Sequence, residues 1–245
     1  MNEEQDVTEM KEVDITNFDL KKVGLSNGPS LQLAEVLKDE HRSLNEKEKL
    51  KIIIEASRHY AKFLTALGVD YENDPNAFGT PVRVAKMFVE DLWKGRYNVL
   101  DPITSFPSDY QGMIVETNIP IFSQCAHHHQ SITGVCHLAY LPGKSKFVIG
   151  LSKLNRIVEH YSRRGQIQED LTMQIFAALC QAVPDNAGVA VVIDAKHSCV
   201  SCRGVKHQGA GMQTAKLAGA FMDEPSCKEE FYMHIQNAVN KNYQM

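Results

Sequence analysis

The chain has 245 residues, of which 43% are hydrophobic and 23% are charged, the composition of a globular protein with a buried core. Its 26 basic and 30 acidic residues give a formal net charge of -4, a balance that argues against a nucleic-acid partner. No apolar run approaches the roughly 20 residues that cross a bilayer, so we expect no membrane partner either.

Residues 1–45 are polar, mixed in charge and weakly periodic, and we expect them to form a partly ordered N-terminal arm. The opening residues are acidic and lack the basic start and apolar stretch of a secretory signal. We therefore expect a cytoplasmic protein.

Residues 46–110 form a predicted N-terminal helical region. Apolar residues recur at helical spacing over 46–69, and Gly68 offers a stop. A second helix is expected after Thr80, as the cap, with proline next to it, and continues to residue 95. Residues 98–110 are expected to be a loop.

Residues 111–245 form the main predicted domain, which begins with segments of strand character. Runs rich in β-branched and aromatic residues predict strands over 112–122, 133–142, 147–150 and 188–195. Amphipathic patterns predict helices over 153–164, capped by Ser152, and over 168–183 and 229–241. This order predicts an α+β domain with its helices packed on one face of a sheet.

The densest reactive side chains occur in two segments, QCAHHH (124–129) and HSCVSCR (197–203), each at the end of a predicted strand. Six cysteines in a chain of this length are too few for a disulfide scaffold, and clustered cysteines in a reducing compartment indicate metal ligands or reactive thiols. Thiolate and imidazole at this spacing suit a tetrahedral Zn²⁺ ion.

Two kinds of zinc site fit these segments. An open catalytic site would use three ligands and leave a position for water. The neighbouring His127, His129 and His197 favour it, because they offer acid/base groups for an activated water. A closed structural site would use four ligands, Cys125, His128, Cys199 and Cys202.

A candidate anion site lies at 152–156, where Lys153 and Arg156 share a face near the start of a predicted helix. Arg203 could add a bidentate phosphate contact. A solvated basic helix face is the alternative. Gln168 and Glu169 could recognise a guanine edge, although acidic residues also stabilise a first helical turn.

Taken together, these residues resemble the GTP cyclohydrolase I family, a resemblance that covers about residues 47–240. The family implies the tunnelling fold, an antiparallel sheet with helices on one face, assembled into a toroidal homodecamer with active sites at subunit interfaces. It implies hydrolysis and rearrangement of GTP to 7,8-dihydroneopterin triphosphate and formate, feeding folate, biopterin or deazapurine synthesis. The matching segments are GTPVRVAKMF (79–88), CAHHHQSITGVCHLAYLPGK (125–144), VIGLSKLNRIVEHYSRRGQIQEDLT (148–172), GVAVVIDAKHSCVSCRGV (188–205) and, more loosely, QTAKLAGAF (213–221).

The resemblance also implies roles for individual residues. Cys125, His128 and Cys199 would bind Zn²⁺, and His127 and His197 would be the acid/base histidines. Gln168 and Glu169 would recognise guanine. The triphosphate would contact Ser152, Lys153, Arg156 and Arg203, with Arg83 and Lys86 reaching over from a neighbouring subunit.

The chain departs from the family pattern at several positions. Ala126 replaces the usual glutamate, and Asp170 replaces the usual arginine. Ala210, Met212 and Ala215 replace serine or threonine positions. Ala126 and Asp170 motivate the hypothesis of a catalytically weakened GTP-binding relative. A related tunnelling-fold enzyme that acts on another purine or pterin is a third hypothesis.

Overall fold

The computed structural model describes residues 43–144, 146–183 and 185–242, all within one of the two units of the chain, Gln32–Met245. The predicted arm therefore lies outside the described residues except for 43–45. The boundary expected between residues 110 and 111 stays a prediction. Within the described ranges, no helix is long and apolar enough to cross a membrane.

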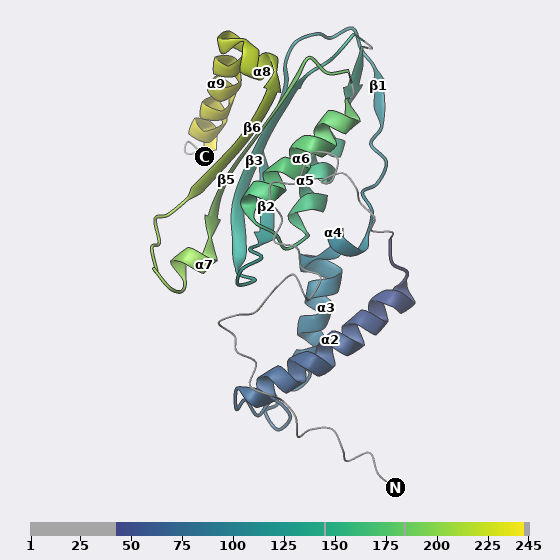
Figure 1. Cartoon of the computed structure of the whole chain (residues 1–245), viewed down its shortest axis with the longest axis vertical. Coiled ribbons are helices and arrows are strands. Elements are labelled where there is room, and N and C mark those ends of the chain that lie inside the picture. The colour runs from purple at the N-terminus through teal and green to yellow at the C-terminus, as the bar shows by residue number, and fades with distance from the viewer. Residues whose placement is uncertain (1–42, 145, 184, 243–245) are drawn as a thin grey trace, which may run out of the picture. The chain divides into compact units, whose positions relative to one another are not determined.

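A four-stranded antiparallel sheet in the order β2-β3-β5-β6 forms the centre of this unit (Figure 1). A shorter antiparallel pair, β1 with β4, lies apart from it. The region 98–110 is thus not entirely a loop, as we had expected, because it contains β1. The strands are β1 (Ser105–Pro107), β2 (Ile114–Gln124), β3 (Ser131–Leu141), β4 (Phe147–Ile149), β5 (Gly188–His197) and β6 (Met212–Gly219).

The predicted first helix is confirmed as α2 (Glu46–Ala66). Its start is fixed by a capping box, in which the Asn45 side chain accepts from the Glu48 N–H and the Glu48 carboxylate accepts from the Asn45 N–H. It ends just before Gly68, whose φ of 74° is a left-handed conformation that favours glycine.

The second predicted helix is divided into α3 (Thr80–Lys86), a π-helical turn η3 (Met87–Leu92) and α4 (Lys94–Tyr97). Thr80 is not the cap, since Gly79 holds that position with a φ of 79°. The Thr80 hydroxyl instead accepts from the Arg83 guanidinium at 2.9 Å.

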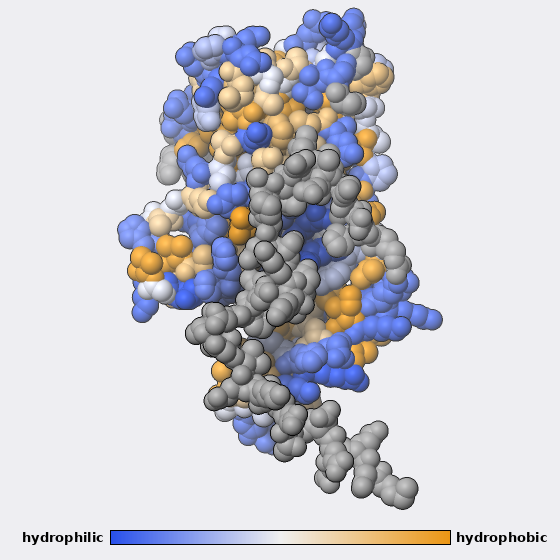
Figure 2. All heavy atoms as spheres, viewed as in Figure 1, coloured by the Kyte–Doolittle hydropathy of each residue, from blue (hydrophilic) through white to orange (hydrophobic). Residues whose placement is uncertain are grey.

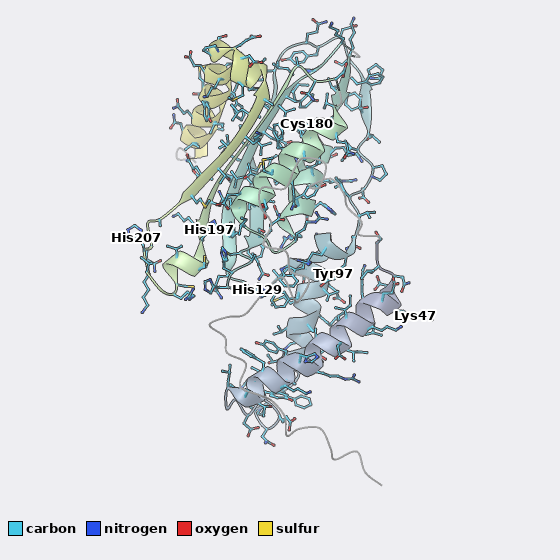
Figure 3. All side chains as sticks on the ribbon, viewed as in Figure 1. Lys47, Tyr97, His129, Cys180, His197 and His207 are labelled. Carbon is cyan, nitrogen blue, oxygen red and sulfur yellow. The ribbon has the colours of Figure 1, made fainter. Side chains whose placement is uncertain are left out.

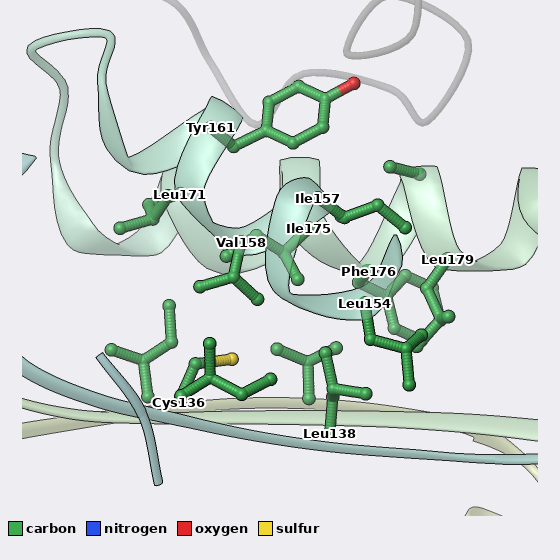
Figure 4. Close-up of a cluster of buried hydrophobic side chains, with 14 of the residues drawn as sticks. Cys136, Leu138, Leu154, Ile157, Val158, Tyr161, Leu171, Ile175, Phe176 and Leu179 are labelled. Atoms are coloured by element: carbon green, nitrogen blue, oxygen red, sulfur yellow. The ribbon is translucent and has the colours of Figure 1, made fainter. Parts of the chain in front are cut away.

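Two helices cover one face of the sheet, α5 (Leu151–Ser162) and α6 (Gln168–Ala182). Their apolar residues, among them Leu154, Ile157 and Ile175, pack onto Leu138 and its neighbours to form the main core (Figure 4). The helix predicted here begins at Leu151, with Gly150 as its cap. Ser152 therefore lies inside the first turn and is not the cap that we had expected.

The opposite face of the sheet also carries a helix, α9 (Pro225–Asn242), whereas we had expected the helices on one face of the sheet only (Figure 1). Phe231 of α9 and Phe221 of α8 (Ala220–Asp223) pack against Ala190 and Val192. Coverage on both faces explains why β5 is a nearly continuous apolar run, since alternate residues of a strand point to opposite faces.

Candidate metal centre and active site

A tight turn between β2 and β3 carries the first reactive segment. The Cys125 N–H donates to Gln130 O, and the His129 N–H donates to Cys125 O, both at 2.9 Å. Cys125 is buried, whereas the side chains of His127 and His128 are exposed.

The register of the sheet brings the second reactive segment beside this turn. Ile132 pairs with His197, the last residue of β5, and α7 (Ser198–Ser201) follows directly. The Ser131 and Ser198 hydroxyls lie 2.7 Å apart across the same strand end. His129, His197 and the exposed His207 consequently lie toward one end of the sheet, and Cys180 of α6 lies toward the other (Figure 3).

Three potential ligands converge at this end: Cys125, His197 and Cys199 have ligand atoms that all lie within 4.8 Å of one another. The pKa of the Cys199 thiol is raised, first by burial and then by the negative charge of Cys125. Two adjacent thiolates need a nearby cation, and two sulfurs with imidazole match the ligand preference of Zn²⁺. The donor set therefore fits the expected metal.

His128, the third expected ligand, lies outside this cluster. Its Nε2 accepts from Arg203 Nη1 at 2.6 Å. A guanidinium can only donate, so the lone pair of His128 is on Nε2 and is occupied by this contact. His128 can ligate a metal through this nitrogen only when Arg203 moves away.

The other expected acid/base group, His127, lies beside the cluster, with Nδ1 3.5 Å from Cys125 Sγ. Cys202 is exposed, and its thiol contacts Ser198 O at 2.6 Å and Gln130 Oε1 at 3.5 Å. Its absence from the cluster favours the open three-ligand site over the closed one.

The expected guanine pair forms the first two residues of α6, and the two side chains have different surroundings. Gln168 is completely buried, and its Oε1 lies 2.8 Å from His197 Nε2. Glu169 is exposed. The pKa of His197 is lowered by burial, an effect that the Glu169 charge opposes.

The expected triphosphate residues of α5 do not reach the metal cluster within one chain. The C-terminal end of α5 lies near the cluster, because the Gln166 N–H donates to Gln124 O at 2.9 Å. Ser152 and Lys153 are at the opposite end of the helix, about 15 Å away along its axis at about 1.5 Å per residue. Arg156 lies one turn further along, 3.8 Å from Asp101.

The two basic residues of α3 also have local partners. Arg83 donates to Asn76 O at 3.2 Å and to Thr80, and Lys86 lies 3.9 Å from Glu90. Within the described ranges, neither contacts another candidate site residue. Of the expected phosphate ligands, Arg203 lies beside the turn between β2 and β3, because it donates a hydrogen bond to His128.

The sequence analysis missed the aromatic residues that pack against the turn between β2 and β3, which we call the metal turn (residues 125–130). The ring of His129 packs edge-on against Trp93, at 5.0 Å between centroids, and against Phe88, at 5.8 Å. The π-helical turn places these two aromatic residues together, since the Trp93 N–H donates to Phe88 O five residues earlier. The available signal was that Trp93 is the only tryptophan of the chain.

The model of one protein family, GTP cyclohydrolase I, matches residues 56–236. The chain belongs to the GTP cyclohydrolase I family. This membership confirms the enzyme class that the sequence analysis predicted. The α+β class with an antiparallel sheet, which the family's tunnelling fold implies, is confirmed as well.

Relatives within the family cover most of the chain. GTP cyclohydrolase 1 of Flavobacterium johnsoniae is 41% identical over 203 residues, 82% of this chain and 87% of the relative. That of Pseudoalteromonas translucida is 40% identical over 188 residues, 74% of this chain and 98% of the relative. A solved dihydroneopterin aldolase from Burkholderia thailendensis, bound to guanine, is 15% identical with a TM-score of 0.29, over 44% of this chain and 92% of its own.

Proposed function

We propose that this member of the family is a zinc-dependent GTP cyclohydrolase I, which converts GTP and water to 7,8-dihydroneopterin triphosphate and formate. The observation that carries the proposal is the convergence of Cys125 and Cys199 with His197 at one strand end, beside His127. The six cysteines are all free thiols, which suits a reducing cytoplasm.

Zn²⁺ would be held by Cys125 and Cys199, with a histidine as third ligand. His128 is the residue expected from the family, and it becomes available when Arg203 turns toward the substrate. The chemistry that a bound Zn²⁺ supplies is a water ligand of lowered pKa, a nucleophile near neutral pH.

Two histidines and one carboxylate are suited to the remaining steps. His127 can donate a proton to the imidazole nitrogen of guanine as the ring opens, and His197 can assist opening of the ribose. Glu169 is exposed at the start of α6 and can accept from the guanine N1–H and the exocyclic amine.

We further propose that the triphosphate is bound by a neighbouring copy of the chain. Ser152, Lys153 and Arg156 lie toward the end of α5 away from the metal cluster, so they suit the site of an adjacent subunit better than their own. Among the described residues, β2 and β6 are the edge strands of the sheet, and they provide surfaces for such a ring. A homodecamer is the assembly that the family implies.

The test measures zinc and turnover on one preparation. We expect about one zinc per chain, formate release from GTP, and a fluorescent neopterin after oxidation of the product. The matched control is Cys199→Ser, which should lose both zinc and product. A preparation with one zinc per chain and no product from GTP would overturn the proposal.

Competition among nucleotides in the same assay tests the alternative that the chain is a related tunnelling-fold enzyme, which acts on another purine or on a pterin. If another purine triphosphate or a pterin displaces GTP at lower concentration and yields product, the chain acts on that compound.

A further inference from the structure

Gln168, the first residue of α6, is 0% exposed, and its side-chain amide is surrounded by polar partners. Nε2 lies 3.3 Å from Ile193 O, 3.0 Å from Met212 O and 3.1 Å from Thr214 Oγ1. Oε1 lies 2.8 Å from His197 Nε2. An amide enclosed and satisfied in this way has no group left to offer to a ligand.

The chemistry of these partners fixes which way round the amide sits. Ile193 O and Met212 O are backbone carbonyls, which can only accept hydrogen bonds. Turning the amide over would place Oε1 against two carbonyl oxygens and leave buried acceptors unsatisfied. Nε2 must therefore face them, and Oε1 must face His197.

A pair of threonines supports the same assignment from the other side. Thr172 Oγ1 donates to Gln168 O at 2.9 Å, so its proton is used. Thr214 Oγ1, 2.6 Å from Thr172 Oγ1, then donates its own proton to Thr172. Its lone pair remains to accept from Gln168 Nε2. The donor directions agree along the whole chain of contacts between α6 and β6.

This orientation determines the tautomer of His197. Because Gln168 Oε1 only accepts, His197 Nε2 must carry the proton, and in the neutral ring the lone pair is then on Nδ1. Nδ1 lies 4.0 Å from Cys199 Sγ, and the imidazole belongs to the same cluster as Cys125. The nitrogen that can take a proton or bind a metal faces the cysteine pair.

We propose that Gln168 is a positioning residue: it holds His197 in the Nε2–H tautomer, with Nδ1 directed at the cysteine pair, and it does not contact guanine. The inference rests on the proposed function and sharpens it, since it leaves Glu169 as the single member of the expected pair that meets the base. Their burial agrees, because Gln168 is enclosed and Glu169 is exposed.

The first test separates positioning from substrate contact. Gln168→Met keeps length and removes the acceptor, so kcat should fall about 10–100-fold, the usual effect of losing a supporting hydrogen bond to a site histidine. The Kd of GTP for the zinc-depleted chain, measured by calorimetry without turnover, should change less than about 2-fold. Glu169→Gln, the matched control, should instead weaken GTP binding. A Gln168→Met chain that loses GTP affinity and keeps kcat would overturn the inference.

A double-mutant cycle excludes a general structural effect. In a His197→Ala background, Gln168→Met should lower kcat little further, because the group that it positions is gone. Equal losses in both backgrounds would show that Gln168 acts elsewhere. A single cooperative thermal transition of Gln168→Met, at a lower temperature because the Ile193 and Met212 carbonyls lose their donor, confirms that the variant folds. Thr214→Val, one contact further away, should give a smaller loss of kcat in the same direction.

The tautomer can be read without any turnover. Solid-state ¹⁵N NMR of the zinc-free, histidine-labelled full chain, compared with His197→Gln, assigns the protonated nitrogen of His197. We expect Nε2–H in the wild type and a mixture in Gln168→Met. Protonation at Nδ1 in the wild type would overturn the inference, whereas an inert chain with Nε2–H would overturn only the proposed function.

Discussion

Cys199 and Cys202 are three residues apart, yet their thiols have different surroundings. Cys199 belongs to the cluster with Cys125, and Cys202 is exposed, with its thiol on Ser198 O. We expect Cys199→Ser to lose bound zinc, because a serine hydroxyl is a poor ligand for this ion, and Cys202→Ser to keep about one zinc per chain. Metal analysis after gel filtration measures both. Loss of zinc from Cys202→Ser would favour the closed four-ligand site.

Ala126 lies in the same turn, exposed between Cys125 and His127. The alanine provides no carboxylate to orient the neighbouring imidazole, and losing such a partner typically costs about 10–100-fold in activity. We expect Ala126→Glu to raise kcat for GTP, with zinc content unchanged. Ala126→Gln is the control for size without charge. An unchanged kcat in Ala126→Glu would mean that the missing carboxylate at residue 126 does not limit the rate of GTP turnover.

At the scale of single residues, the sequence predicted which segments meet but not which atoms do. Cys125 and Cys199 could be named from spacing, because thiolates at strand ends have few other roles in a reducing compartment. The placement of His128 against Arg203, and of His197 among the thiols, depends on the turn geometry and on side-chain direction. Gln168 was predicted to bind guanine, since no pattern in the sequence shows that its amide is enclosed.

At the scale of the elements, the helical region contacts the metal turn through Trp93, which packs closely against the backbone at Gly165. Gly165, after α5, has a φ of 67°, and a Cβ there would lie 2.4 Å from Trp93 Nε1. Trp93 in turn packs on His129. The absence of a side chain at residue 165 is therefore what lets the tryptophan reach the turn.

We expect Gly165→Ala to lower the free energy of unfolding by about 2–4 kcal/mol, from left-handed strain of about 1–2 kcal/mol plus overpacking. The control is Gly68→Ala, which has a similar φ of 74° but nothing within 4 Å of the added Cβ. It should cost only the backbone part. Chemical denaturation of both variants measures the difference in the free energy of unfolding. Equal losses in the two variants would show that the contact with Trp93 does not contribute to the cost.

The elements were largely predictable where pattern and caps agreed. α2 has both helical periodicity and a capping box, and β5 has a continuous apolar run, and both are confirmed. The π-helical break at Met87–Leu92 was not predictable, because it accompanies the packing of Phe88 and Trp93 on His129, a residue distant in sequence. β1 was missed for a similar reason: three exposed residues form a strand only because β4 lies beside them.

At the scale of the whole molecule, α2 exposes more apolar surface than a surface helix needs. Apolar side chains appear among charged ones over this helix in Figure 2. Leu50 is 54% exposed and Ile54, one turn later, is 42% exposed; Phe63 and Leu67 repeat the spacing at 54% and 63%. Such a row indicates a surface that another chain covers.

We expect the wild type to sediment as an assembly well above the 27.5 kDa of one chain. The double variant Leu50→Glu with Ile54→Glu should shift it to smaller species, because burying each of these side chains is worth about 1.5–3 kcal/mol and a buried charge reverses that gain. The control is Lys51→Glu with Lys62→Glu, which changes charge at exposed positions of the same helix and should leave the assembly intact.

GTP turnover should fall on dissociation only if the smaller species lack the neighbouring chain that supplies Ser152, Lys153 and Arg156. If Cys125 and Cys199 of one chain hold the zinc, as proposed, a variant that falls to single chains should keep its zinc and lose GTP turnover. A variant that dissociates only as far as a closed ring should keep both its zinc and its GTP turnover. Sedimentation, metal analysis and formate release on the same fractions distinguish these outcomes. Full turnover by single chains would contradict the shared site, and a wild type that is itself a single chain would contradict the assembly.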